Sequence, residues 1–156
     1  MKDGKFLNIT FQQQLSILLG KKWINEEYIL SSDGLDIATF NFGFNWKAGS
    51  KWPGKQLPQE FWESLELELG NKFTTSWQQG FENLSEYINW IQSCETLITL
   101  DSLGLHIALS LGKNVIAIFG PTNDKNVKMY ERGRKICYHG DQDKLIKDLL
   151  RIVNEA

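Results

Sequence analysis

Residues 94–122, CETLITLDSLGLHIALSLGKNVIAIFGPT, constrain the fold more than any other part of the chain. The apolar runs 96–100 and 115–119 are rich in β-branched residues, which is typical of buried strands. Between them, residues 103–111 are almost wholly apolar and end at Gly112, as a helix with a left-handed cap does. Two buried strands around one short helix predict a β-α-β crossover in a parallel sheet.

Polar side chains follow both predicted strands directly. Asp101 and Ser102 come after the first strand, with His106 one turn into the helix, and Thr122 and Asn123 come after the second. Open α/β sheets bind ligands at the carboxyl ends of their strands, so this edge is the predicted ligand site. Helix capping remains an alternative role for the first two residues, and a buried core position remains one for the histidine.

The other segments extend the same pattern. Pro58 precedes a predicted helix over 59–69, a second helix covers 84–92, and an amphipathic helix covers 142–154. Strands are expected at 37–43, 72–77 and 135–138, with a turn of helix near 129–130. The order predicts one doubly wound, Rossmann-like α/β domain over residues 36–156. Residues 1–35 are weakly patterned apart from a short helix over 11–19, and we interpret them as the remnant of a preceding segment or a linker.

Composition narrows the possible functions. The chain has 156 residues, with 17 basic and 19 acidic side chains and a net charge of -2, and no basic tract stands out. This balance argues against nucleic acid as the main partner. The start of the chain lacks a long apolar core, so we expect a cytoplasmic protein without an integral membrane segment, with peripheral membrane association left open. Cys94 and Cys137 lack metal-type spacing and predict buried or idle thiols rather than a metal site.

A loop with three lysines follows the first strand. Lys47, Lys51 and Lys55 lie in NWKAGSKWPGK, together with Gly49 and Gly54. Glycine lets a backbone approach a ligand closely, and lysine is a compact charge suited to phosphate. The loop matches neither the Walker A spacing nor the dinucleotide fingerprint, so an anion site and a simple solvated loop both stay open.

Three segments carry a resemblance to a known family. Residues 46–53, Gln78-Gln79-Gly80 and above all 97–122 resemble glycosyltransferase family 9, which includes the lipopolysaccharide heptosyltransferases. The resemblance covers about residues 42–135 and falls in the C-terminal, donor-binding half of the family's GT-B fold of two Rossmann-like domains. It implies binding of a nucleotide-diphosphate sugar for inverting, metal-independent transfer to a glycan or lipopolysaccharide-type acceptor, with no cofactor.

The resemblance also implies donor-binding positions. Lys51, before Trp52-Pro53, matches the family lysine that contacts the donor phosphates, and Gln78 or Gln79 stands where the nucleoside is met. The implied set is Lys51, Gln78, Gln79, Asp101, Ser102, Leu103, Gly104 and His106. Many family members have glycine where this chain has Leu103, with Gly104 one position later, so the backbone approach to the ligand is expected to differ in detail.

No catalytic residue is assigned. The family's proposed base is an aspartate near the start of an N-terminal acceptor domain, and the residues before the predicted domain are too few for it. We therefore expect a truncated or split glycosyltransferase, inactive alone, whose partners are a nucleotide sugar and a separate acceptor-binding domain. One alternative is a non-catalytic nucleotide- or protein-binding module with Trp46, Trp52 and Trp77 at its interface. Another alternative is a flavodoxin-like or sugar-epimerase-like domain. The absence of a glycine fingerprint after the first predicted strand argues against dinucleotide binding.

Overall fold

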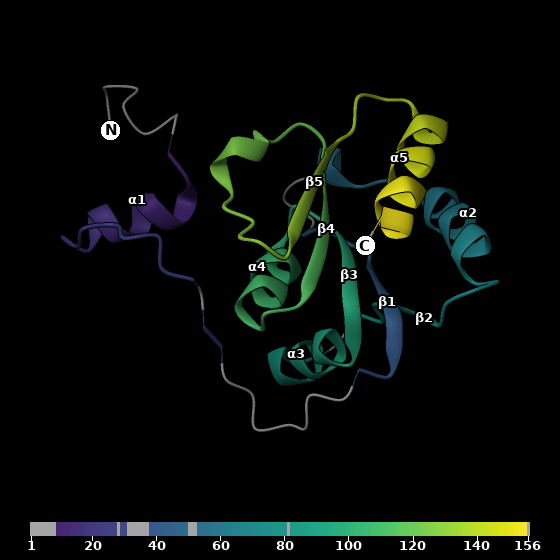
Figure 1. The fold of residues 1–156 in the computed structure, drawn as a ribbon, viewed down its shortest axis with the longest axis horizontal. Coiled ribbons are helices and arrows are strands. Elements are labelled where there is room, and N and C mark those ends of the chain that lie inside the picture. The colour runs from purple at the N-terminus through teal and green to yellow at the C-terminus, as the bar shows by residue number, and fades with distance from the viewer. Residues whose placement is uncertain (1–8, 28, 31–37, 50–52, 81, 156) are drawn as a thin grey trace.

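A five-stranded, all-parallel sheet forms the centre of the protein, as a computed structural model shows (Figure 1). The structure describes residues 9–27, 29–30, 38–49, 53–80 and 82–155. The strand order is β2-β1-β3-β4-β5, and every neighbouring pair is parallel. The strands are β1 Phe40–Asn45, β2 Thr75–Trp77, β3 Cys94–Leu100, β4 Asn114–Phe119 and β5 Gly133–Cys137.

Helices cover both faces of the sheet, which confirms the predicted doubly wound fold (Figure 1). Helices α2 (Gln59–Leu69) and α5 (Gln142–Glu155) cover one face, and α3 (Leu84–Gln92) and α4 (Leu103–Ser110) cover the other. Each face has its own apolar core, with fully buried Phe44 and Trp62 on the first and Leu97 and Leu105 on the second. A parallel sheet buried on both faces explains the continuous apolar runs of β3 and β4.

Most predicted boundaries are confirmed, and the differences have local causes. Strand β1 extends to Asn45. The side chain of that polar residue is fully buried at the end of the strand, and its hydrogen bonds allow it to be there. Strand β2 starts later than predicted because the N–H groups of Lys72 and Phe73 bond back to the carbonyl of Leu69 in the last turn of α2. The helical turn predicted near residues 129–130 is wrong. Tyr130 has a φ of 56°, and the 3-10 helix η2 spans Asp124–Asn126 instead.

Helix α1 (Phe11–Leu18) lies beside the loop that joins β4 to β5. It begins at Thr10, whose hydroxyl accepts a hydrogen bond from the N–H of Gln13 at 3.3 Å. The Gln12 amide is only 2% exposed; it donates to the Lys128 carbonyl at 3.1 Å and accepts from the Lys128 N–H at 3.3 Å. These paired bonds fix α1 to that loop. No helix among the described residues is long and apolar enough to cross a membrane, and the expected cytoplasmic location stays a prediction.

The two cysteines should differ sharply in reactivity. Cys94 is fully buried, its Sγ lies 3.3 Å from the Trp90 carbonyl, and burial raises its thiol pKa to about 11. Cys137 is exposed. Because the thiolate is the reactive form, iodoacetamide at pH 8 is expected to modify Cys137 alone in the folded protein and both cysteines in urea. Mass spectrometry counts the adducts, and rapid native labelling of a Cys137→Ser variant would contradict the assigned burial.

Candidate functional site

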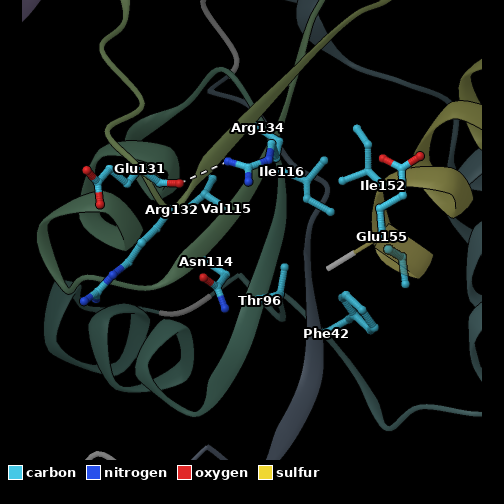
Figure 2. Close-up of a pocket in the computed structure, with 11 residues that line it drawn as sticks. Phe42, Thr96, Asn114, Val115, Ile116, Glu131, Arg132, Arg134, Ile152 and Glu155 are labelled. Atoms are coloured by element: carbon cyan, nitrogen blue, oxygen red, sulfur yellow. Dashed lines mark hydrogen bonds between the residues drawn. The ribbon is translucent and has the colours of Figure 1, made fainter.

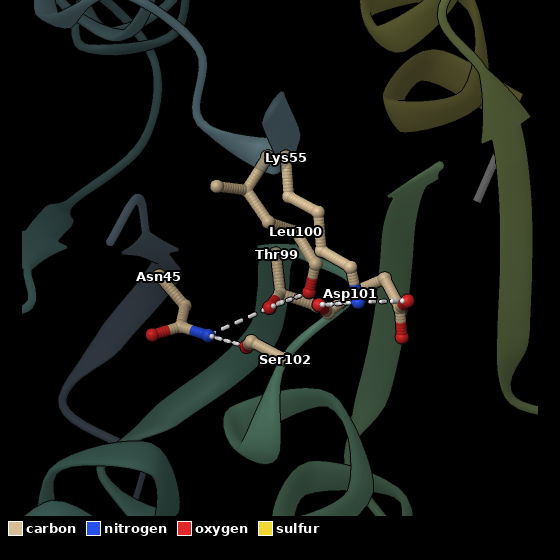
Figure 3. A network of polar contacts seen from close by, with 6 residues as sticks. All are labelled: Asn45, Lys55, Thr99, Leu100, Asp101 and Ser102. Carbon is tan, nitrogen blue, oxygen red and sulfur yellow. Dashed lines mark hydrogen bonds and ion pairs between the residues drawn. The ribbon is translucent and has the colours of Figure 1, made fainter. Parts of the chain in front are cut away.

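The strand order reverses between β1 and β3, and such switch points are where open α/β sheets bind ligands. The last residue of β1 is Asn45, and β3 ends at Leu100, so Asp101 and Ser102 stand at the same carboxyl edge. The turn after β1 carries the 3-10 helix η1 (Pro53–Lys55), which returns to this edge (Figure 3). The structure therefore places the predicted Asp101 and Ser102 at the switch point of the sheet.

An ion pair joins the loop after β1 to the end of β3. The Nζ atom of Lys55 lies 2.6 Å from Oδ2 of Asp101 and 3.2 Å from its backbone carbonyl (Figure 3). Both side chains are mostly buried, with 17% and 15% of their surface exposed. A lysine and a carboxylate held together with little water give a fixed, strongly polar centre. Such a centre suits a ligand that carries both phosphate groups and hydroxyls.

A second group of polar side chains lies beside this ion pair. The Nδ2 atom of Asn45 donates to the hydroxyls of Thr99 at 2.7 Å and Ser102 at 2.9 Å (Figure 3). The Tyr87 hydroxyl, from α3, donates to Oδ1 of Asn45 at 2.7 Å. Burial raises the pKa of Tyr87 to about 12, although its hydrogen bonds with Asn45 and Ser102 act in the other direction. Tyr87 therefore stays protonated at neutral pH, and the group links β1, α3, β3 and the start of α4.

Ser102 is the residue that precedes α4, but its side chain makes no capping hydrogen bond there. Leu103 is 61% exposed at this edge, whereas Gly104 is buried. A Cβ on Gly104 would lie 2.2 Å from the Tyr87 hydroxyl oxygen and 2.4 Å from Nδ2 of Asn45. At Gly104 the polar group of Asn45 and Tyr87 therefore leaves no room for a side chain, whereas Leu103 faces outward.

His106 lies one turn further along α4 and is partly buried. Its ring centroid is 6.3 Å from that of Phe11, so α1 reaches the same end of α4. Burial lowers the pKa of His106; the charge of Asp101 raises that pKa and the charge of Lys55 lowers it further. The imidazole is thus neutral at pH 7, and the charges of both Asp101 and Lys55 affect its pKa.

The lowered pKa of His106 predicts a pH dependence of stability. The folded state binds this proton less readily than the unfolded chain, so the free energy of unfolding should fall as pH drops through about 6.5. Above that pH both states hold a neutral ring, and no loss from this group is expected. Urea denaturation at pH 8 and pH 5.5 measures the difference. A His106→Gln variant should lose less stability than wild type over this range; parallel curves for the two proteins would contradict the assignment.

The remaining predicted site residues lie further along the same edge or outside the described residues. Gln78 follows β2; its side-chain oxygen accepts from the Lys47 N–H at 3.3 Å and its carbonyl accepts from Nε1 of Trp46 at 3.0 Å. The amide of Gln79 bonds only 2 residues back, to the Trp77 carbonyl at 3.2 Å. None of these bonds joins either glutamine to Asp101. Lys51 falls outside the described residues, so its predicted role stays a prediction.

Three residues of the site are absent from the set derived from the sequence. Lys55 was within the lysine loop, but only the fold shows that it, at the end of η1, reaches Asp101. Asn45 carried a weak signal, as a polar residue that ends an apolar strand. Tyr87 lies in the helix predicted over 84–92, and no local pattern indicates its bond to Asn45.

A pocket of about 410 Å³ lies at the opposite, amino-terminal edge of the sheet (Figure 2). Its lining includes Thr96 and Asn114 near the starts of β3 and β4, and Ile152 from α5. The Arg134 guanidinium reaches it from β5 and donates to the Glu131 carbonyl at 3.0 Å. Glu131, Arg132 and Arg134 therefore lie at this edge and not at the carboxyl edge of the sheet.

The sheet order and the polar group at its switch point define a doubly wound, Rossmann-like α/β domain. Residues 80–148 match the sequence model of glycosyltransferase family 9 (heptosyltransferase). This match confirms the resemblance to that family, and the structural neighbours described next confirm the fold. A search of curated proteins gave no match.

Solved structures share the fold. E. coli ADP-heptose LPS heptosyltransferase II superposes with a TM-score of 0.58 and 14% identity, over 100% of this chain and 54% of that one. E. coli heptosyltransferase WaaC with ADP-2-deoxy-2-fluoro heptose gives 0.66 and 13%, over 92% and 54%. The glycosyl transferase family 9 protein from Veillonella parvula DSM 2008 gives 0.52 and 19%, over 89% and 42%. This chain thus spans about half the length of these proteins, and identities this low establish the fold alone.

Proposed function

We propose that this chain is the donor-binding half of a glycosyltransferase and holds a nucleotide-diphosphate sugar at the carboxyl edge of β1 and β3. The observation that carries the proposal is the Lys55–Asp101 pair, at 2.6 Å, placed at the start of α4 and at the switch point of the sheet. Support comes from the match to family 9 and from the fold shared with a heptosyltransferase solved with an ADP-sugar analogue.

The chemistry of this edge fits a diphosphate leaving group. When the bond between sugar and diphosphate breaks, negative charge grows on the departing nucleoside diphosphate. The Lys55 ammonium and the amide N–H groups at the start of α4 are suited to stabilise that charge directly. Asp101 holds Lys55 in place, and its carboxylate and the neutral His106 ring offer acceptors for sugar hydroxyls. Gln78 and Gln79, at the end of β2, are our candidates for the nucleoside, with Lys51 as a further phosphate contact.

A complete reaction needs a second domain in this proposal. An inverting transfer requires a base that removes a proton from the acceptor hydroxyl, and we place that base on a separate acceptor-binding domain. The related solved chains are about twice as long as this one. The segment before the sheet also exposes apolar side chains that a neighbouring domain could cover; they include Leu18, Leu19, Ile24 and Ile29. The proposed acceptor is a glycan or a lipopolysaccharide-type molecule.

The alternative of a protein-binding module gains no specific support. Trp46 and Trp77, two of its three expected interface residues, pack against each other with ring centroids 5.8 Å apart. Trp77 also lies 5.5 Å from Phe44 of the core, and Nε1 of Trp46 is bonded to the Gln78 carbonyl. Both rings therefore extend the core, and Trp52 lies outside the described residues.

Isothermal titration calorimetry with ADP, UDP, GDP and AMP tests the proposal. At least one nucleoside diphosphate is expected to bind in the micromolar to millimolar range, and the corresponding monophosphate is expected to bind more weakly because it lacks the second phosphate. Absence of binding by every nucleotide, and by the matching nucleotide sugars, would overturn it. Transfer activity is expected only in a mixture with an acceptor-binding domain.

A further inference from the structure

We propose that Tyr87 and Asn45 are positioning residues that hold the Ser102 side chain away from the N–H groups at the start of α4. The Gly104 N–H, the second of the helix, is thereby left available to the phosphates of a nucleoside diphosphate, whereas the Leu105 N–H already donates to the Ser102 carbonyl at 3.2 Å. The ligand in this inference rests on the proposed function, whereas the positioning of Ser102 rests on geometry alone. Neither Tyr87 nor Asn45 belongs to the set of donor-binding residues that the family resemblance implied.

The hydrogen bonds around Asn45 have a fixed direction. The Tyr87 hydroxyl donates to Oδ1 of Asn45 at 2.7 Å, which turns the Nδ2 group toward the other side. That group has two hydrogens, and they go to the hydroxyls of Thr99 at 2.7 Å and Ser102 at 2.9 Å. The Thr99 hydroxyl in turn donates to the Leu100 carbonyl at 2.8 Å, so it accepts from Asn45 (Figure 3). Ser102 is therefore held as an acceptor for Asn45.

As a consequence, the side chain of Ser102 does not cap α4. A serine at this position ordinarily accepts a hydrogen bond from the second or third N–H of its helix. Ser102 has the extended backbone of a capping residue, with φ -149° and ψ 177°, yet makes no such bond. Other helices of the same protein are capped: Asn83 accepts from the Glu86 N–H at 2.9 Å at the start of α3. The hydrogen bonds of the Ser102 hydroxyl with Asn45 and Tyr87 account for the difference, because they draw that hydroxyl toward β1 and α3.

Tyr87 is itself held in place. Its ring stacks on Trp90, with centroids 6.0 Å apart and an interplanar angle of 6°, and Nε1 of Trp90 donates to the Ser76 hydroxyl at 3.0 Å. Gly104 allows the approach to α4, since a Cβ there would lie 2.2 Å from the Tyr87 oxygen. The hydroxyl that orients Asn45 is thus fixed by α3, by Ser76 of β2 and by the first turn of α4.

A double-mutant cycle tests whether Tyr87 acts through Ser102. Tyr87→Phe removes the bond that orients Asn45, so Ser102 can turn and cap α4; ADP affinity is expected to fall about 2- to 10-fold. In a Ser102→Ala background no hydroxyl can cap the helix, and Tyr87→Phe is expected to change ADP affinity very little. Tyr138→Phe, on the other face of the sheet, is the matched control and is expected to bind ADP like wild type. Asn45→Ser, whose shorter side chain does not reach Ser102, replaces Tyr87→Phe if that variant does not fold.

Two outcomes would overturn the positioning role: no loss of affinity in Tyr87→Phe, or an equal loss with and without the Ser102 hydroxyl. Amide hydrogen exchange provides a readout that needs no nucleotide. The Gly104 N–H is expected to exchange more slowly in Tyr87→Phe than in wild type, and to show no such change in the double variant. If wild type binds no nucleotide, the proposed function fails, and the exchange rates still decide whether Tyr87 controls Ser102; unchanged rates would overturn that role.

Discussion

A Lys55→Ala variant is expected to bind ADP about 10- to 100-fold more weakly than wild type, the scale of one lost hydrogen bond to a charged group. Two effects add in the same direction. The variant removes the ammonium that we place against the phosphates, and it leaves the Asp101 carboxylate, now without the partner 2.6 Å away, close to a negatively charged ligand. Calorimetry on folded protein, checked by circular dichroism, measures the change.

The other lysines of the loop provide the controls. Lys47 is exposed and its Nζ lies over the Trp46 ring, 4.5 Å from the centroid, so Lys47→Ala is expected to alter ADP affinity less than about 2-fold. Lys51→Ala belongs in the same series, because the family resemblance assigned the phosphates to that residue. A large loss in Lys51→Ala with none in Lys55→Ala would contradict the role given to the ion pair.

Gly104→Ala is expected to destabilise the protein by about 2–4 kcal/mol, which corresponds to a fall in Tm of roughly 5–15 °C for a chain of this size. The added Cβ would stand 2.2 Å from the Tyr87 oxygen and 2.4 Å from Nδ2 of Asn45. Neither neighbour can move away without a loss of stability, because Asn45 is fully buried with three hydrogen-bond partners, Tyr87, Thr99 and Ser102. Relief of the clash therefore breaks buried hydrogen bonds.

Differential scanning calorimetry measures this effect. Gly49→Ala is the matched control, since a Cβ at that glycine would meet nothing within 4 Å and its backbone is not left-handed. We expect Gly49→Ala to stay within about 0.5 kcal/mol of wild type. A Gly104→Ala variant as stable as Gly49→Ala would mean that Asn45 and Tyr87 do not pack against α4 as the structure describes.

The sequence predicted the fold well because its signals are local. The runs that became β3 and β4 are apolar on both faces, as parallel strands between two helical layers must be. Pro58 marked the start of α2, and Gly112, with a φ of 69°, ended α4 as a left-handed cap. The error near Tyr130 arose because a polar loop that turns through one residue of positive φ looks like a weak helical turn.

The site was predictable only in part, for a physical reason. Asp101, Ser102 and His106 follow one strand within a single motif, so their spacing alone brought them together. Asn45 ends β1 and Lys55 ends η1 in the loop after it. They lie 57 and 46 residues along the chain from Ser102 and Asp101, their respective partners. Such contacts depend on which strands are neighbours, and no alternation or spacing within one element encodes that.

The central claim is that the carboxyl edge of β1 and β3 binds a nucleoside diphosphate. Titration of 15N-labelled protein with ADP, followed by NMR, tests it most directly because each amide reports its own position. We expect saturable shifts at Lys55, at residues 101–106 and near Gln78, with Thr96, Asn114 and Arg134 at the opposite edge unaffected. Shifts confined to that opposite edge, or no saturable shift at any amide, would contradict the claim.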